Sequence, residues 1–98
     1  MSHLIKKLEE LESRIKKLEM NSELFNALKQ RRKELARQFN VPVYFIATNQ
    51  SLQSLIDVNP TSLTELENVY GFGSYKINMY GYAFLNVLVW HSVGQRRV

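Results

Sequence analysis

The sequence contains no cysteine, which excludes disulfide bonds, thiolate metal sites and cysteine nucleophiles. Its two histidines, His3 and His91, lie near opposite ends of the 98 residues, so they form no metal-binding motif. The longest apolar run, from Tyr82 to Trp90, has nine residues, whereas a helix that crosses a bilayer needs about 20. We therefore expect a soluble chain with no metal, no cofactor and no membrane contact.

Residues arranged for catalysis are also missing. Glu65 and Glu67 are two residues apart on one predicted helix and point in different directions, so they cannot work as an acid and base pair. Gly71 and Gly73 follow a predicted helix instead of a strand, and they lack the spacing of a Walker loop. The sequence predicts no catalytic residue.

The charge of the chain leans towards a polyanionic partner. Lysine and arginine number 13 against nine acidic residues, which gives a formal net charge of +4. Residues 1–21 contribute +1 and residues 22–98 contribute +3. The second part of the chain is therefore the better candidate for nucleic-acid contact.

The first part of the chain has the pattern of a coiled coil. Its apolar seam alternates steps of four and three residues, at Leu4, Leu8, Leu11, Ile15 and Leu18. Lys7 and Arg14 at g positions would face Glu12 and Glu19 at e positions of a parallel neighbour. We predict a parallel homo-oligomer, dimer or trimer, through residues 4–18. The alternative is a single amphipathic helix that packs on its own domain.

The domain boundaries follow from the same pattern. Asn21-Ser22-Glu23 interrupts the seam and is typical of a helix N-cap with an acidic first turn. We predict a heptad-patterned helix over residues 1–21, a helical domain over 22–92 and a basic tail over 93–98. Lys-Lys-Leu-Glu occurs twice in the first segment, as expected of an added fusion helix. The alternative is that this helix is native to the protein.

The first helix of the domain is predicted from Glu23 to Phe39, with apolar residues at helical spacing. Opposite them lies a row of bases four residues apart, here called the basic stripe: Lys29, Lys33 and Arg37. Such a row is either a solvated face or a phosphate-binding surface, and the absence of an acidic residue within it favours the second.

Turn and cap residues predict the remaining helices. Pro42 opens a short helical turn that includes Tyr44, whose ring either joins the core or stacks on an unpaired base. Thr48 begins a helix that Asn59-Pro60 ends, and Ser62 to Glu65 forms a capping box for the next. Ser74 is the expected N-cap of a long last helix. The predicted fold is all-α, a compact bundle of about five short helices.

Gly71-Phe72-Gly73 forms the turn before the last helix. Two glycines allow positive φ angles and leave the amides that open the helix uncovered, so the amides after Gly73, from Ser74 on, and the side chain of Lys76 are candidates for phosphate contact. The alternative is a tight connector between two core helices. The ring of Tyr75 is the alternative to Tyr44 for stacking on an exposed base.

Several segments, in order, resemble the HRDC domain, the helicase and RNase D C-terminal module of RecQ-type helicases and ribonuclease D. They are Leu28 to Ala36, Asn40 to Ile46, Asn49 to Leu52, Asn59 to Leu66, Gly71 to Lys76, Tyr80-Gly81 and Phe84. The resemblance covers about two thirds of the chain and excludes the heptads. Two residues depart from the family pattern: Tyr70 replaces an apolar residue or proline, and Arg31 an apolar residue.

The resemblance implies an intracellular auxiliary domain, in the bacterial cytoplasm or the nucleus, beside a helicase core or a nuclease. In some members the surface around the residue equivalent to Tyr44 is used for DNA, and Lys76 follows a turn like that of a helix-hairpin-helix. We therefore predict a non-catalytic domain that binds single-stranded or junction DNA weakly, in a protein of DNA repair or recombination. The alternative is a protein-interaction or intramolecular module, contacting the helicase core or a partner through exposed tyrosines and Phe72, without DNA contact.

Overall fold

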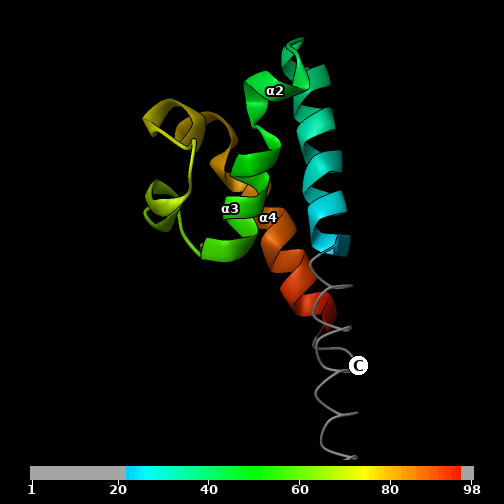
Figure 1. Cartoon of the computed structure of the whole chain (residues 1–98), viewed down its shortest axis with the longest axis vertical. Coiled ribbons are helices and arrows are strands. Elements are labelled where there is room, and N and C mark those ends of the chain that lie inside the picture. The colour runs from blue at the N-terminus through cyan, green and yellow to red at the C-terminus, as the bar shows by residue number, and fades with distance from the viewer. Residues whose placement is uncertain (1–21, 96–98) are drawn as a thin grey trace, which may run out of the picture.

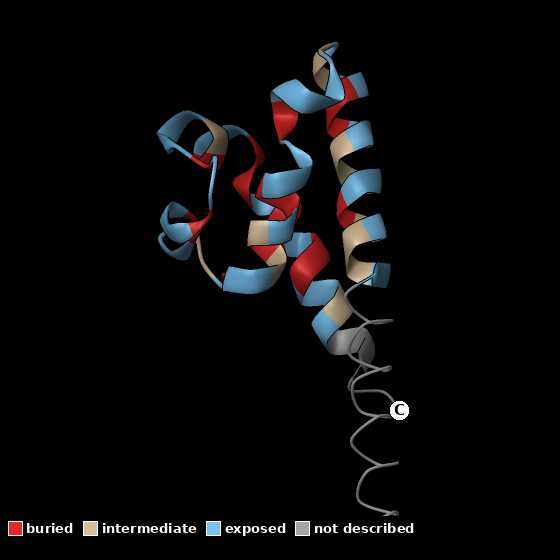
Figure 2. Cartoon of the chain, in the orientation of Figure 1, coloured by how far each residue is buried: buried red, intermediate tan, exposed pale blue. Residues whose placement is uncertain are grey.

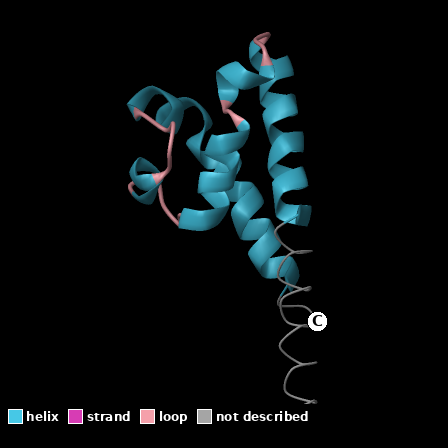
Figure 3. Cartoon of the chain, in the orientation of Figure 1, coloured by secondary structure: helices cyan, strands magenta, loops and turns pink. Residues whose placement is uncertain are grey.

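The computed structural model describes residues 22–95, and side chains as far as Ser92. The predicted oligomerisation residues Leu4, Leu8, Leu11, Ile15 and Leu18 lie outside the described residues, as do Arg96 and Arg97 of the predicted tail. No strand occurs within residues 22–95, and short loops join the helices (Figure 3). The all-α prediction is confirmed.

Five helical segments follow one another. The first helix spans residues 22–39 and is followed by α2 (Val43–Ile46), α3 (Asn49–Val58), the 3-10 helix η1 (Glu65–Asn68) and α4 (Ser74–Gln95). The first helix and α4 run in opposite directions, and α3 lies between the first helix and the segment that holds η1 (Figure 1). The last helix has 22 residues, which agrees with the long last helix that we predicted.

The core lies where the inner faces of these helices meet (Figure 2). Its fully buried side chains come from every described segment: Leu28, Ile46, Leu52, Leu55, Leu66 and Phe84. Two pairs of aromatic rings meet edge to face, Phe39 with Tyr80 at 5.3 Å and Phe72 with Phe84 at 5.7 Å between centroids. Each pair brings α4 against an earlier part of the chain, so α4 is the element around which the others assemble.

The predicted boundaries of α3 are confirmed in atomic detail. The Thr48 hydroxyl accepts a hydrogen bond from the backbone N–H of Ser51 at 3.2 Å, which satisfies a donor at the helix start. At the other end Asn59 takes the left-handed conformation, with φ of 50°, and its N–H donates to the Leu55 carbonyl. Pro60 follows and prevents continuation.

Arg32 joins the first helix to the α2–α3 connection. Its Nη1 donates to the Ala47 carbonyl at 3.1 Å and to Asn49 Oδ1 at 2.8 Å. Its Nε is buried without a partner in the described part of the chain, and burial lowers the pKa of the guanidinium. Arg32 therefore links the first helix to residues 15 and 17 positions further along the chain.

The predicted capping box does not start an α-helix. The Ser62 hydroxyl accepts from the N–H of Glu65 at 3.2 Å, as expected, but the Glu65 carboxylate accepts from the N–H and hydroxyl of Thr61, at 2.6 and 2.9 Å. A capping box would return that carboxylate to Ser62. The segment therefore closes as a short 3-10 helix, which is the correction to our prediction.

This carboxylate makes a pH-dependent contribution to stability. The backbone hydrogen bond from Thr61, and then the one from its hydroxyl, lower the pKa of Glu65 below the usual 4.5. Because the folded-state pKa is lowered, the stabilisation is present above pH 4.5 and is lost as the pH falls through the folded-state value. We expect Glu65→Gln to lower the Tm slightly at pH 7 and to leave it unchanged at pH 2. Thermal melts at both pH values, with Glu67→Gln as control, test this. An equal Tm loss at both would contradict it.

Gly81 marks the closest approach of α4 to the η1 segment. A Cβ at this position would lie 2.8 Å from Leu63 Cδ2 and 3.0 Å from Leu66 Cδ1. A Cβ could not be added at these distances without moving the leucine side chains, so α4 packs closely against Leu63 and Leu66 here. Within the described residues, no helix is long and apolar enough to cross a membrane.

Candidate nucleic-acid interface

The basic stripe lies on the outer side of the first helix. Lys29, Lys33 and Arg37 are all exposed, while Leu28 and Leu35 on the opposite side are buried. Lys29 Nζ sits 4.9 Å from the centre of the Phe25 ring, a cation–π contact that holds it near the start of the helix. In the described part of the chain, the single ion pair joins Arg31 and Glu34 at 3.7 Å, so no acidic side chain neutralises the stripe there.

The short helix α2 exposes apolar surface next to the end of the first helix. Tyr44 is 67% exposed and Phe45 is 55% exposed. Ile46 is the one buried residue of this helix. The structure therefore excludes a core position for Tyr44 and leaves its ring free for stacking. Sequence reasoning missed Phe45, because one turn of helix is too short to show an apolar period.

The glycine turn rests on the serines of α3. Gly71 has φ of +82°, and a Cβ there would clash with Ser51 Oγ, so glycine is required. The N–H of Tyr70 donates to Ser54 Oγ at 2.9 Å. Gly73 has no positive φ, and a Cβ would meet no atom within 4 Å. Our prediction of positive φ therefore holds for one glycine and is wrong for the other.

The start of α4 differs from the prediction by one residue. The N–H of Ile77 donates to the Gly73 carbonyl at 3.0 Å, so Gly73 is the N-cap and Ser74 is the first helical residue. The amides of Ser74, Tyr75 and Lys76 precede this first intrahelical bond, at an exposed turn. This arrangement offers N–H donors to an anion beside a half-buried lysine.

The predicted site residues form two groups. Figure 1 shows the first helix at one edge of the molecule and the segment leading from η1 to α4 beyond α3. The stripe points away from the core, whereas Tyr75 and Lys76 lie at the start of α4. The contact of Phe39 with Tyr80, one turn after Lys76, brings the end of the first helix near the start of α4. This contact is made by inward-facing rings, so it joins the two helices without bringing the outward-facing stripe to Lys76.

Phe72 does not belong to any exposed surface. It is only 5% exposed and packs edge to face against Phe84. Our prediction that it contacts a partner is wrong, because the turn that frees the neighbouring amides drives this ring into the core. Tyr70 and Tyr75 on either side are 58% and 64% exposed.

The outer side of α4 is an apolar surface that the sequence analysis missed. Exposed side chains recur there at helical spacing, at Tyr75, Met79, Tyr82, Val89 and Trp90, which we call the α4 outer face. Between Ser74 and Ser92 the helix carries one charged residue, Lys76. The signal was present in the sequence, since a helix apolar on all sides has more apolar surface than one core contact can bury.

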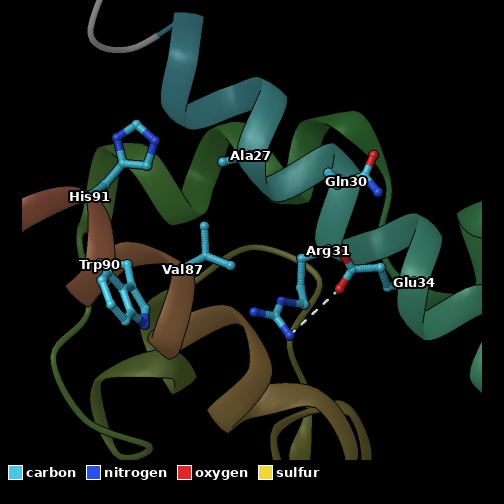
Figure 4. Close-up of a pocket in the computed structure, with 7 residues that line it drawn as sticks. All are labelled: Ala27, Gln30, Arg31, Glu34, Val87, Trp90 and His91. Carbon is cyan, nitrogen blue, oxygen red and sulfur yellow. Dashed lines mark ion pairs between the residues drawn. The ribbon is translucent and has the colours of Figure 1, made fainter. Parts of the chain in front are cut away.

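A shallow pocket of about 240 Å³ adjoins this face, between the first helix and the end of α4 (Figure 4). Ala27 and Val87 contribute apolar atoms, and Trp90 and His91 stand at one side. The Arg31–Glu34 ion pair lies at the other side. No group of three or more residues suited to a metal occurs among the described residues.

A search of protein families matches residues 21–88 to the HRDC domain. The chain belongs to the HRDC domain family. HRDC domains are accessory domains of RecQ helicases, and proteins similar to this chain are named RecQ helicases. The ATP-dependent DNA helicase RecQ of Haemophilus influenzae is 31% identical over 71 residues, which is 72% of this chain and 12% of the relative. The RecQ of Bacillus subtilis is 35% identical over 65 residues, which is 66% of this chain and 11% of the relative.

A solved structure supports the same assignment of the HRDC domain. The D. radiodurans RecQ HRDC domain 3 is similar with a TM-score of 0.67 and 32% identity, covering 69% of this chain and 90% of that one. The predicted resemblance is confirmed. This chain spans about an eighth of the length of the full RecQ relatives.

Proposed function

We propose that this HRDC domain is a non-catalytic accessory domain of a RecQ-like DNA helicase that binds single-stranded or junction DNA weakly. The observation that carries the proposal is the basic stripe, three exposed bases in a row with no acidic partner in the described part of the chain. Lysine and arginine at the spacing of one helical turn offer successive contacts to backbone phosphates.

Two further features support a single-stranded ligand. The exposed ring of Tyr44 lies just beyond the end of the stripe in the chain, where it would stack on an unpaired base. The uncovered amides after Gly73, with Lys76, would hold a phosphate. Because these contacts are few, binding is weak and depends on salt.

A titration of a labelled 20-nucleotide single strand at two salt concentrations tests the proposal. Engagement of three or four phosphates per copy predicts a slope of about −2 to −3 for log K against log salt. Tyr44→Ala should weaken single-strand binding by about fivefold or more and duplex binding less, because a base in a duplex cannot stack on it. Tyr82→Ala, an exposed tyrosine of the α4 outer face, is the matched control and should bind normally.

No binding at low salt would overturn the proposal. Equal loss of single-strand and duplex binding in Tyr44→Ala would remove the stacking role and keep the phosphate contacts.

The α4 outer face favours a second function, the docking of a protein. It holds aromatic side chains without accompanying bases, a composition typical of protein interfaces and unsuited to a charged backbone. The helicase core of the parent protein is the candidate partner. The two surfaces share Tyr75 at the start of α4 and otherwise use different residues, so the basic stripe and the rest of the α4 outer face can act at the same time.

A further inference from the structure

We infer that Phe45 is a second stacking residue of α2, so that Tyr44 and Phe45 together hold two neighbouring unpaired bases of a single strand. The two residues are here called the α2 platform. This inference deepens the proposed function, in which α2 contributes one ring, and it rests on that function. The ligand that fits the platform is single-stranded nucleic acid with its bases unstacked.

The directions of the two rings are the first argument. Successive residues of an α-helix are turned from one another by about 100°. Ile46 is fully buried, so Tyr44, two residues earlier, points almost directly outwards, while Phe45 points to one side of α2. Both residues are more than half exposed. Because their directions differ, the rings cannot lie on the two faces of one base, and each is available to a different base.

The second argument is that α2 lies at the end of the basic stripe (Figure 1). Arg37, the last base of the stripe, is in the last turn of the first helix, and α2 follows after residues 40–42. The backbone reverses at Asn40, which has φ of 55°, and the N–H of Val41 donates to the Ala36 carbonyl at 3.0 Å. The connection from the stripe to the platform is therefore a short, hydrogen-bonded turn.

The connection after α2 is bonded to the first helix as well. Ala47, the C-cap of α2, is fully buried, and its carbonyl accepts a hydrogen bond from Arg32 Nη1 at 3.1 Å. With both ends of α2 bonded to the first helix, the place of the platform relative to the stripe is set before a strand binds. Such preorganisation lowers the entropy cost of stacking.

The third argument is the charge around the platform. Residues 35–56, which include α2 and most of α3, contain one charged side chain, Arg37, and no carboxylate. On either side of this stretch the next acidic residues are Glu34, which is paired with Arg31, and Asp57 near the end of α3. A strand whose phosphates contact the stripe can therefore continue over α2 without meeting a like charge in this stretch.

A flexible strand suits this arrangement better than a duplex. The bases of a single strand can be unstacked and turned towards rings that point in different directions, whereas paired bases are held inside the double helix. Each base that stacks on an aromatic ring strengthens binding by about fivefold or more. The platform therefore favours a single strand over a duplex twice, once through each ring.

The test compares Phe45→Leu with Phe45→Tyr in the full chain, with the same labelled single strand. Leucine keeps an apolar side chain without a ring, whereas tyrosine keeps a ring that can stack. Phe45→Leu should lose about fivefold or more in affinity, and Phe45→Tyr should bind within about twofold of wild type. The salt slope should not change, because neither variant removes a phosphate contact. Val43→Ala is the matched control, since Val43 is exposed on the same helix and has no ring, and it should bind normally.

A strand of the same length that carries no bases separates stacking from any other effect. Wild type and Phe45→Leu should bind this abasic strand equally, because only its phosphates and sugars remain. Equal thermal unfolding of all the variants shows that the domain remains folded.

Two outcomes overturn the α2 platform and leave the proposed function standing. One is wild-type affinity of Phe45→Leu for the normal strand while Tyr44→Ala binds weakly, which would leave the ring of Phe45 to a protein partner. The other is an equal loss by Phe45→Leu on the normal and abasic strands, since that loss would not involve a base. If wild type binds neither strand at low salt, the proposed function and the platform both fail.

Discussion

Gly71→Ala is expected to destabilise the domain by about 2–5 kcal/mol. A non-glycine residue in the left-handed region costs about 1–2 kcal/mol, and Gly71 has φ of +82°. The added methyl group would also collide with Ser51 Oγ, and forcing a group into a packed site costs about 1–3 kcal/mol more. Ser51 is 2% exposed and its hydroxyl is paired with that of Thr48, so it cannot simply rotate away.

Gly73→Ala in the same turn is the matched control. Its φ is not positive and the space beside it is open, so the loss of stability should stay within about 1 kcal/mol. Urea unfolding of both variants, followed by far-UV circular dichroism, measures the difference. Equal losses would show that the turn does not depend on the conformation of Gly71. A normal stability of Gly73→Ala together with weaker DNA binding would support close approach of a phosphate there.

Phe84→Ala is expected to cost about 3–5 kcal/mol, because removing a fully buried ring loses its transfer energy and leaves a cavity. Phe84 is 0% exposed and meets Phe72 edge to face, so the variant also releases the ring that anchors the glycine turn. A small domain has only about 5 kcal/mol or slightly more to lose. We expect the Tm to fall by roughly 15 °C or more, close to loss of the folded state at 25 °C.

Tyr82→Ala on the same helix is the control for this prediction. Tyr82 is 73% exposed, and its removal should change the free energy of unfolding by no more than about 0.5 kcal/mol. Thermal denaturation of the two variants separates the inner and outer faces of α4. A fall in Tm of less than about 5 °C for Phe84→Ala would contradict the prediction, and would mean that neighbouring side chains fill the space left by the ring.

Local signals in the sequence predict most of the helices correctly. Thr48 and Asn59 cap the two ends of α3. Their roles are predictable because a cap involves residues only three or four positions apart in the sequence. The spacing of Leu28 and Leu35 predicts the buried side of the first helix for the same reason.

The errors arise where two alternatives differ by one residue or depend on distant neighbours. Glu65 had two possible hydrogen-bonding partners, Ser62 and Thr61, and the structure selects the second, which gives a 3-10 helix. The bonds of Arg32 span 15 and 17 residues, beyond any local period. Phe72 is buried because its ring packs against Phe84 of α4. The residues around the turn do not indicate this contact, because Phe84 is 12 residues away.

The site was predicted less completely than the fold. Tyr44 and the basic stripe are exposed as their proposed roles need, yet exposure alone assigns no ligand. The α4 outer face was missed because a helix with apolar residues on all sides shows no amphipathic period that separates an inner from an outer side.

The position of α4 also bears on how the chain folds during synthesis. Tyr80, Phe84 and Leu88 complete the core, and they belong to the last described helix. Until these three residues have left the ribosome, the apolar sides of the first helix, α3 and η1 lack the helix against which they pack. The nascent domain therefore keeps apolar surface exposed to solvent until its last described helix has been synthesised.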